Sequence, residues 1–583
     1  MKYIYFLLFI FLINIVDAQK YDYNWYTGYD FNDDTIDLPY AVLHWNFNTN
    51  NLNPIFQVDN FKKMDFTWTI NNMSDYDGNY LFSYNGGYLE NYKNILIPNS
   101  KTKAYPDDVF NQMAVILPFA KNSNIYALLY KSYTNFGNFV GTKTISKSLI
   151  NIDSQSMGKI LLKGAIVVSD TLQLESISAV KHSNGRDWWV LIFNRFNNAY
   201  YSIKVDNIIE TIKKIDIGRL DSNLINQHCA FSPNGNFFAL SSVVSHIDSV
   251  RSQVVLYNFD RRSGLLSNPT YFQFYDINSY SSIGVCFSPN SKLLYISRPN
   301  EILQINLLDS NYLPEKIIEY DGFKDTIDGN FVAYSPFGFL NNAPDGRIYG
   351  TSSCCQQRHL FYINRPNLKG KSCDARQHAI PVTMHSNIPS FPNYRLGPID
   401  GSVSDSLGIN NVPVAEFRYD QDTIEYKKIE FTNLSWYEPD EWWWDWGDGS
   451  SMYYTTVWDT SIIHYYAQDG IYQVCLRAKN MNGEHTICKE IKLGTTGINS
   501  LKPNIAIQMY PNPAHNILII NVEEYLPSKM LMTIYDLQGE EVLQNRLYQG
   551  SNMIDLENMN AGVYLVEIRE RGMLVKCEKL VKM

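Results

Sequence analysis

Two sets of ionisable side chains in this sequence have residue types that could carry out catalysis. Asp445 and Asp448 are close in the chain, and two carboxylates about 5 to 9 Å apart can serve a glycosidase. His228, His359 and His385 could supply a base or metal ligands if the fold brought them together. The aspartates, however, occur in a glycine-containing turn, where side-chain-to-backbone hydrogen bonds shape the chain. Scattered histidines more often pack or hydrogen-bond, so we expect a structural role for both sets.

A third set consists of tryptophans, which bind ligands by stacking. Besides the adjacent pair Trp188 and Trp189, there is a dense group: Trp436, Trp442, Trp443, Trp444, Trp446 and Trp458. Because successive residues of a strand face opposite sides, residues 442–444 cannot all be buried in one core. An exposed indole ring suits stacking on a sugar or a partner protein. We therefore predict ligand-binding surfaces at Trp188, Trp189, Trp442, Trp443 and Trp444.

The motifs of several large enzyme classes are missing from the sequence. It has no His-Glu-x-x-His, no Gly-x-Ser-x-Gly, no phosphate loop and no Cys-x-x-Cys pair. Residues 75–79 superficially resemble a calcium loop, but such a loop needs flanking helices and a Glu at its twelfth position. A hairpin turn is the better interpretation. We predict a protein that uses no cofactor or metal and is not an enzyme.

Composition indicates which elements must position these residues. The chain has 583 residues, 14% aromatic and 19% charged, with 42 Tyr, and helical periodicity is hard to find. Such a mixture favours an all-β protein. The net charge is −10, from 49 basic and 59 acidic residues, and no long basic run occurs. This balance argues against a nucleic-acid partner.

A repeat runs through the middle of the chain. Residues 229–241 and 285–297 each give a strand, a Ser-Pro-Asn-Gly or Ser-Pro-Asn-Ser turn and a second strand, and residues 343–350 contain a third copy. The turn prolines are 56 and 55 residues apart. Fainter copies occur at residues 75–82, 122–129 and 184–191.

A period of this length with several short strands per unit is typical of a β-propeller. Each blade leaves an apolar face that only its neighbours can cover, so the ring must close. We predict about seven blades, because residues 20–405 contain roughly seven such periods. The propeller is expected to span residues 19–405, and the three histidines could converge on its axis.

The N-terminal residues have the pattern of a signal peptide. Met1 and Lys2 precede an apolar segment, residues 4–13, and small residues lead up to Ala18. We predict removal of residues 1–18 by cleavage between Ala18 and Gln19. The apolar segment is too short to span a membrane comfortably.

A separate module follows a short linker, residues 406–411. Residues 412–494 contain several apolar strands and the run Trp443-Trp444-Asp445-Trp446-Gly447-Asp448-Gly449-Ser450. This pattern closely resembles the PKD domain, and the resemblance implies a small Ig-like β-sandwich. The residues of 472–478 alternate between inward and outward positions.

The cysteines allow one sharp prediction. Cys475 and Cys488 flank the turn at residues 480–483 at equal distances, so they lie opposite each other in a hairpin. We predict a disulfide between them, which a secreted protein would keep oxidised. Among the others, Cys229 and Cys286 lie in equivalent strands of successive repeat copies, but their positions in these strands differ by one residue. Their side chains should therefore face opposite ways. Cys373 could bridge to one of two nearby residues, Cys354 or Cys355, and Cys577 lies near the C-terminus.

The last part of the chain, residues 505–583, follows a second linker at residues 495–504. It contains Tyr510-Pro511-Asn512-Pro513, then an apolar strand, then Ile534-Tyr535-Asp536-Leu537-Gln538-Gly539, then Gly562-Val563-Tyr564-Leu565, and it ends in a basic segment. It closely resembles the type A C-terminal sorting domain of the type IX, or Por, secretion system. The resemblance implies a small C-terminal β-sandwich, and it implies the secretion machinery as a partner. It also implies release, or attachment to surface lipopolysaccharide, when the domain is removed.

A further resemblance is carried by residues 64–66, 77–86, 116–119, 184–189 and 391–397. Through these segments residues 20–405 resemble a family of large type IX-secreted propeller proteins that has no established substrate. We therefore expect a secreted or cell-surface binding or adhesion protein. Its propeller would recognise a glycan or a surface protein, and the PKD-like module would act as a spacer. The alternatives are a secreted polymer-degrading hydrolase with an active site on the propeller axis, and a structural component of the cell envelope.

Overall fold

The protein is all-β, as predicted from its composition. The computed structural model describes residues 19–28, 42–59, 61–62, 64–66, 69–102, 112–119, 124–135, 140–172, 175–194, 199–206, 210–216, 224–246, 249–276, 283–327, 331–352, 357–385, 387–422, 425–458, 461–494, 507–522, 530–536, 539–548, 550–570 and 573–583. The predicted signal peptide, residues 1–18, lies outside these residues. No helix in the described part of the chain is long and apolar enough to cross a membrane.

Seven antiparallel sheets of three or four strands, here called blades 1 to 7, follow one another along the first part of the described chain. The strands of blades 1 and 2 are β1 (Asn24–Thr27), β2 (Val42–Asn46), β3 (Ile55–Asp59), β4 (Asn71–Ser74), β5 (Tyr80–Tyr84) and β6 (Leu89–Asn91). Those of blades 3 and 4 are β7 (Ala114–Pro118), β8 (Ile125–Asn135), β9 (Val140–Asn151), β10 (Lys159–Leu172), β11 (Ser178–Lys181), β12 (Trp188–Phe193), β13 (Ala199–Val205) and β14 (Glu210–Asp216).

Blades 5 to 7 carry the three clear copies of the repeat. Blades 5 and 6 consist of β15 (Leu224–Phe231), β16 (Phe237–His246), β17 (Ser249–Asp260), β18 (Leu265–Asp276), β19 (Gly284–Phe287), β20 (Leu293–Arg298), β21 (Glu301–Asn306) and β22 (Pro314–Glu319). Blade 7 consists of β25 (Phe337–Asn342), β26 (Ile348–Ser352), β27 (Gln357–Ile363) and β28 (Ala375–His385), with the 3-10 helix Gly370–Cys373 before β28. A separate hairpin, β23 (Lys324–Ile327) and β24 (Phe331–Tyr334), lies between blades 6 and 7 in the chain.

The seven blades form a propeller. In every blade the strands pair in chain order, and the first strands of successive blades contact one another, as β1 contacts β4, β15 contacts β19 and β19 contacts β25. Blade 1 packs on blade 7 through one buried cluster that includes Trp25, Trp45 and Tyr349. The apolar faces of blade 1 and blade 7 therefore cover each other. This contact closes the ring, as the repeat predicted.

Each of the six predicted repeat copies forms the hairpin of the first two strands of a blade, so these repeat turns lie at one end of the propeller. The repeated residues close the turn through their side chains. Ser232 Oγ accepts a hydrogen bond from Phe237 N–H at 2.9 Å and donates one to Asn234 Oδ1 at 2.7 Å. Ser288 makes the same two bonds in the next copy. The turn at residues 75–79 is likewise a hairpin turn.

A two-sheet sandwich, here called the sandwich module, follows the propeller. Its strands are β29 (Phe417–Gln421), β30 (Lys428–Asn433), β31 (Glu441–Asp445), β32 (Tyr453–Thr455), β33 (Ile462–Tyr465), β34 (Gly470–Asn480) and β35 (Gly483–Leu493). The sheets have the orders β29-β30-β33 and β32-β31-β34-β35. Cys475 and Cys488 face each other in β34 and β35 with Cα atoms 4.1 Å apart and form the predicted disulfide.

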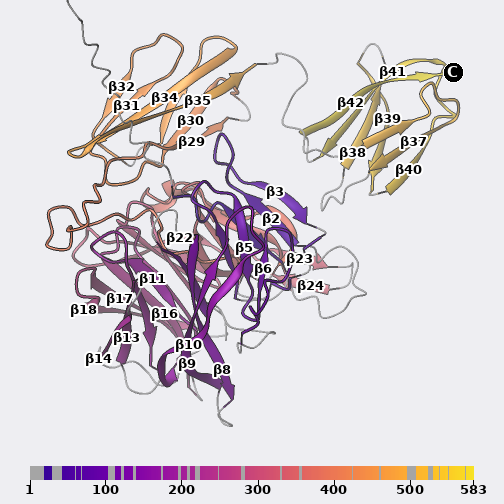
Figure 1. Ribbon diagram of the computed structural model, residues 1–583. Helices are drawn as coiled ribbons and strands as arrows, with labels where there is room; N and C mark the ends of the chain where they lie inside the picture. Colours follow the sequence, from indigo (N-terminus) through magenta and orange to yellow (C-terminus); the bar gives the residue numbers. More distant parts are fainter. Residues whose placement is uncertain are drawn as a thin grey trace, which may run out of the picture. The chain divides into compact units, whose positions relative to one another are not determined.

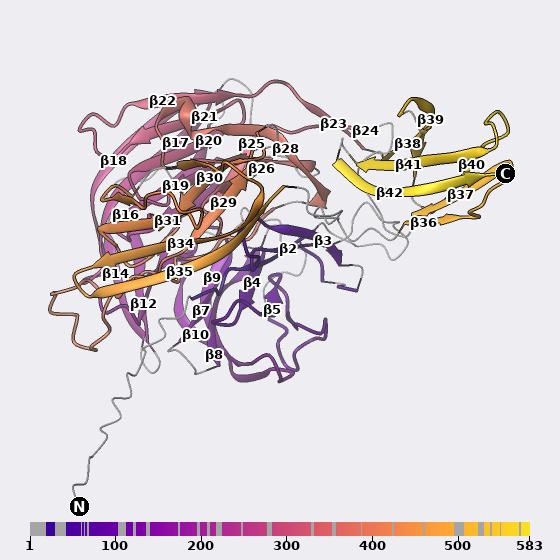
Figure 2. The same ribbon diagram turned by 90° about the horizontal axis from the view of Figure 1, so that it is seen from above.

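The sandwich module packs directly on the propeller, and the two belong to one compact unit (Figures 1 and 2). Arg347 in blade 7 forms an ion pair with Asp420 of the module at 3.0 Å. Arg418 of the module donates a hydrogen bond to the carbonyl oxygen of Asp345 at 2.6 Å. The module therefore does not stand apart from the propeller as a spacer.

Gly494–Met583 form a second compact unit, here called the C-terminal unit, with its own apolar core. Its strands are β36 (Ile507–Tyr510), β37 (Ile517–Val522), β38 (Met530–Tyr535), β39 (Glu541–Leu547), β40 (Gly550–Asp555), β41 (Gly562–Glu570) and β42 (Met573–Lys582). They form two sheets, β36-β37-β40 and β39-β38-β41-β42. This arrangement agrees with the small β-sandwich that the sorting-domain resemblance implied.

Candidate binding sites

A cavity of about 220 Å³, here called the turn cavity, lies where the repeat turns meet the sandwich module. The turns of blades 5, 6 and 7 contribute residues 233–234, 289–291, 343–344 and 346. The segment that follows blade 7 contributes residues 391–393 and 395–398, and the module contributes residues 433–438 and Trp458. Three equivalent turns thus form one wall, and a loop of a different domain forms another.

Two buried guanidinium groups line the turn cavity. Arg395 pairs with Asp22, with 3.0 Å between Nη1 and Oδ2, and its guanidinium lies 4.7 Å from the centre of the Trp436 ring. Arg261 donates to the carbonyl oxygen of Lys181 at 2.8 Å. Burial lowers the pKa of Arg261 to about 10, so this side chain remains charged at neutral pH.

The loop of the sandwich module that lines the cavity has a strained backbone. Tyr437 and Glu438 have φ values of 64° and 50°, a region that residues other than glycine rarely adopt. Asn480 Nδ2 holds the loop by donating to the carbonyl oxygen of Tyr437 at 2.9 Å. Gln19 Nε2 donates to the Tyr437 hydroxyl at 2.8 Å and Gln19 Oε1 accepts from Lys181 at 3.1 Å. The residue predicted to begin the mature chain therefore links the propeller to this loop, whereas Ala18 lies outside the described residues.

Four polar atoms at the turn cavity are buried and have no hydrogen-bond partner among the described residues. They are Asn342 Oδ1, Asn411 Oδ1, Trp458 Nε1 and Arg395 Nε. Buried polar groups are nearly always satisfied, so such atoms indicate a place for water or ligand groups. Amide groups and aromatic rings together suit a neutral polar ligand that has both hydroxyl groups and an apolar face.

The prediction that Trp188 and Trp189 are exposed is wrong. Their exposed fractions are 1% and 2%. Both lie in β12, the second strand of blade 4, where Trp188 packs with residues of blades 2 and 3 and Trp189 packs with residues of blade 5. In a propeller both faces of a blade are covered by its neighbours, so the alternation that exposes one residue in a simple sheet buries both here.

Residues 442–444 follow the alternation that was expected for a sandwich. Trp442 and Trp444 are buried in the core of the module, so the prediction of binding surfaces at these two residues is wrong. Trp443 points to the outer face of β31 and is partly exposed. Its ring lies 4.0 Å from the Arg477 guanidinium and 5.1 Å from the Tyr454 ring. Trp443 is thus the only one of the five predicted tryptophans at a surface of the described structure.

The structure places the predicted histidines in two blades, with His228 in blade 5 and with His359 and His385 on the paired strands β27 and β28 of blade 7. His228 is buried in blade 5, where Nδ1 accepts from Val285 N–H at 3.3 Å and the ring stacks on Phe339. Burial lowers its pKa to about 3. His359 lies in blade 7 with its ring against Phe323, and the side chain of His385 lies outside the described residues. No group of three or more His, Cys, Asp or Glu in the described residues is arranged to hold a metal ion.

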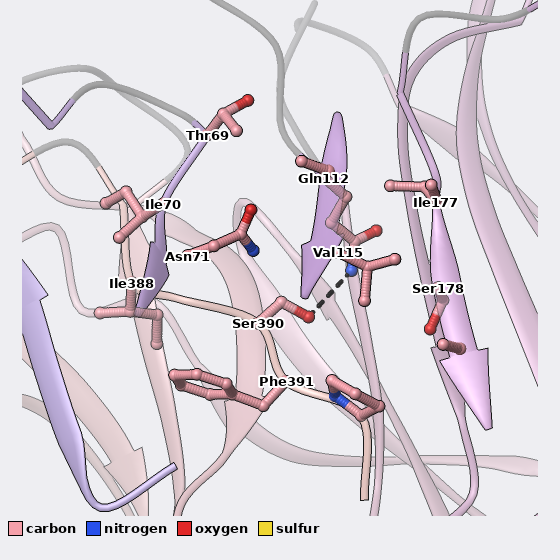
Figure 3. A pocket seen from close by; sticks show the side chains of 13 residues that line it. Thr69, Ile70, Asn71, Gln112, Val115, Ile177, Ser178, Ile388, Ser390 and Phe391 are labelled. Carbon is pink, nitrogen blue, oxygen red and sulfur yellow. Dashed lines mark hydrogen bonds between the residues drawn. The ribbon is translucent and has the colours of Figure 1, made fainter. Parts of the chain in front are cut away.

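A small cavity of about 20 Å³, enough for one water molecule, lies among the first strands of blades 2, 3 and 4 (Figure 3). Gln112 crosses this region, donating from Nε2 to the carbonyl oxygen of Cys229 at 2.9 Å and to Ser390 Oγ at 3.1 Å. The lining comes from β4, β7, β11 and the segment after blade 7, and its described side chains are uncharged.

The two aspartates of the sandwich module shape a turn, as expected. Asp445 Oδ1 accepts from Gly447 N–H at 3.1 Å, and Asp448 Oδ1 accepts from Ser450 N–H at 2.9 Å. Asp448 Oδ2 lies 2.8 Å from His464 Nε2. Burial alone would raise the pKa of Asp448, but the bonds from Ser450 and His464 outweigh it and lower the pKa to about 2.

Asp448→Asn is therefore expected to destabilise the protein above pH 4. The folded-state pKa of about 2 lies below the usual value of 3.8, so the unfolded state binds more protons between these values. The stabilisation by Asp448 is complete above the unfolded pKa and is lost as the pH falls through the folded pKa. Urea unfolding midpoints should differ between variant and native protein at pH 6 and converge near pH 2. A difference of the same size at both pH values would contradict this role.

The remaining described cysteines are free. Cys229 packs toward blade 4 and Cys286 toward blade 7, which confirms that they face opposite ways. Cys373 is a buried free thiol, and burial raises its pKa to about 11. Its two candidate partners, Cys354 and Cys355, lie outside the described residues.

Comparison with known families identifies two domains. Residues 508–583 match the family of secretion system C-terminal sorting domains, and residues 410–493 match the PKD domain family. The chain is thus a type IX secretion cargo that carries a PKD domain. The sorting domain implies interaction with the type IX machinery and export to the cell surface or the medium. No curated protein matches this chain.

Solved structures with some similarity include a putative 6-phosphogluconolactonase from Bacteroides uniformis, 13% identical, which covers 63% of this chain and 98% of its own, with a TM-score of 0.37. Another is Sqt1 from Chaetomium thermophilum, 12% identical, covering 72% and 93%, with a TM-score of 0.32. A protein of unknown function from Desulfotomaculum acetoxidans is 13% identical, covering 50% and 82%, with a TM-score of 0.31. These similarities are too distant to bear on the function of this chain.

Proposed function

We propose that this protein is a non-enzymatic binding or adhesion protein outside the cell and that it recognises a glycan in the turn cavity. The observation that carries the proposal is the cavity itself, about 220 Å³ in volume, with aromatic rings, amides and unpartnered buried polar atoms in its lining. Ligand sites typically combine an apolar, aromatic lining with a few polar groups that fix orientation.

The ligand chemistry follows from the lining. Trp436 and Trp458 offer aromatic rings, and Asn342 and Asn411 offer side-chain oxygens without partners. A sugar has an apolar face that stacks on such rings and hydroxyl groups that bond such oxygens. Arg395 is already paired with Asp22, so its charge does not require an acidic ligand.

In this proposal the sandwich module is not a spacer but forms part of the binding site. Its loop at residues 433–438 contributes to the lining, and ion pairs fix it on blade 7. The propeller and the module would therefore bind the ligand together. We further propose that the mature protein becomes attached to surface lipopolysaccharide once the sorting domain is removed. The presence of the sorting domain supports this proposal. Surface fractionation with lipopolysaccharide-specific staining would test it.

Trp458→Ala is expected to weaken glycan binding about two- to tenfold, since an aromatic contact contributes about 0.5–1.5 kcal/mol. The ligand is first selected on a glycan array, and affinity is then measured by calorimetry. Trp443→Ala provides the matched control, because Trp443 lies on the outer face of β31 and does not line the turn cavity. Loss of binding in Trp443→Ala alone would move the site to the outer face of the sandwich module and contradict the proposal.

A further inference from the structure

A second cavity, of about 160 Å³ and here called the acidic cavity, lies between blades 2 and 3. The turn after β4 contributes residues 75–77, and the turn after β9 contributes residues 153–154. The end of β7 and the start of β8 contribute residues 118–119 and 124–126. Tyr21 completes the lining and directly precedes Asp22, which lines the turn cavity.

Two tyrosine hydroxyls in the acidic cavity lack a hydrogen-bond partner among the described residues. Tyr21 and Tyr126 are 6% and 5% exposed, and neither hydroxyl forms a hydrogen bond within the described residues. Burial raises the pKa of both phenols well above the usual value, and the nearby Asp75 raises both further. The hydroxyls are thus neutral, and their oxygens can accept hydrogen bonds from a ligand.

Every charged side chain in the described lining is a carboxylate, namely Asp75, Asp77 or Asp153. Backbone N–H groups fix two of them: Asp75 Oδ1 accepts from Asn79 N–H at 2.8 Å, and Asp153 Oδ1 accepts from Gln155 N–H at 2.9 Å. None of the three forms an ion pair with a described Lys or Arg. The described lining therefore presents negative charge that no described Lys or Arg pairs with.

Aromatic rings surround this charge. Tyr76 and Phe119 line the cavity together with the two buried tyrosines, and the Tyr21 and Tyr76 rings meet edge to face at 6.0 Å. A small metal ion does not suit the site, because the described carboxylates are not grouped for metal coordination. An organic cation suits it better, since aromatic faces attract ammonium groups and apolar walls accommodate an alkyl chain. Amino sugars fit less well, because their many hydroxyls would need further polar partners.

We propose that the acidic cavity binds an alkylammonium group, as carried by a lysine side chain of a partner protein. The alkyl chain would lie between the rings. The ammonium would donate hydrogen bonds to the Tyr21 and Tyr126 hydroxyls and would be attracted by Asp75, Asp77 and Asp153. This site is separate from the glycan site of the turn cavity, and the two can be tested independently.

The experiment is a titration of the full mature protein with Nα-acetyl-lysine methylamide, followed by NMR. The Nε-acetylated form of the same compound is the neutral control, and glucosamine represents amino sugars. Asp77→Asn and Asp153→Asn remove charge, while asparagine retains a side-chain oxygen that can accept the turn bonds of Asp153. Tyr21→Phe and Tyr126→Phe remove the hydroxyls and retain the rings. Asp309→Asn, in an exposed turn of blade 6, is the matched charge control.

We expect the lysine derivative to bind and the Nε-acetylated form to bind at least tenfold more weakly. The double variant Asp77→Asn with Asp153→Asn should lose at least tenfold in affinity, Asp309→Asn should bind normally, and added salt should weaken binding. Equal binding of the acetylated compound would overturn the proposal. Preference for glucosamine, or an equal loss in Asp309→Asn, would overturn it as well. Unchanged affinity in both Tyr→Phe variants would overturn the role assigned to the hydroxyls.

Discussion

Deletion of residues 508–583 is expected to abolish export of the protein beyond the outer membrane. These residues match the secretion system C-terminal sorting domain, and they fold as a compact unit with its own core, separate from the unit that ends at Leu493. Their removal therefore leaves the propeller and the sandwich module intact while it removes the part that the secretion machinery recognises. Cell fractionation and immunoblotting should find the truncated protein in the periplasm and almost none outside the cell.

A point variant in the C-terminal unit serves as the control for the deletion, because it changes one residue and keeps the sorting domain. Cys577→Ser changes a free, partly exposed thiol in β42 and should leave export unchanged. Normal amounts of the truncated protein outside the cell would show that export does not depend on this domain.

Arg347→Met is expected to cause a large loss of stability, because this one side chain connects three parts of the fold. The Arg347 guanidinium pairs with the fully buried Asp345 at 2.8 Å and with Asp420 of the sandwich module at 3.0 Å. It also donates to Asn53 Oδ1 of blade 1 at 2.7 Å. Removing one partner of a buried ion pair costs about 3–5 kcal/mol, because the remaining charge is left uncompensated.

The same substitution should make stability less sensitive to acid. Burial would raise the pKa of Asp420, but Arg418 and Arg347 outweigh burial and lower it below the usual value of 3.8. The native protein therefore has a stabilisation from this carboxylate that is complete above the unfolded-state pKa and is lost as the pH falls through the folded-state pKa. Without Arg347 the folded-state pKa of Asp420 rises, so this stabilisation is smaller at neutral pH and less of it is lost in acid.

Urea unfolding of the mature protein at pH 7 and at a pH below 3.8, the usual pKa of Asp, tests both expectations, because the difference between native protein and variant should shrink at the lower pH. The control is Arg376→Met, since Arg376 forms a largely exposed pair with Asp374 and its loss should cost less than about 1 kcal/mol. Similar unfolding curves for the two variants would show that the contact between blade 7 and the sandwich module contributes little to stability.

The architecture could be read from the sequence because it repeats. The Ser-Pro-Asn turn is closed by hydrogen bonds between nearby residues, such as Ser232 with Phe237. The same residue types are therefore needed at each such hairpin, and they appear in the sequence as a recognisable repeat. The disulfide was predictable for the same reason, because Cys475 and Cys488 are paired by a local hairpin. Both inferences depend on contacts between residues that are close together in the chain.

The binding sites could not be predicted from local sequence patterns. Trp188 and Trp189 look like one buried and one exposed residue of a strand, and only the packing of neighbouring blades shows that both are buried. The turn cavity brings together residues from positions 22 to 458, and it depends on how the sandwich module docks on the propeller. Docking is fixed by pairs such as Arg347 with Asp420, which are distant in the chain and have no local pattern.

The most direct test of the proposed function is binding of residues 19–494 to a glycan and surface-protein array, with released products scored on the same samples. We predict retention of a glycan without turnover, and reduced retention for Trp458→Ala. Release of shortened glycans would contradict the account and would support a secreted hydrolase instead.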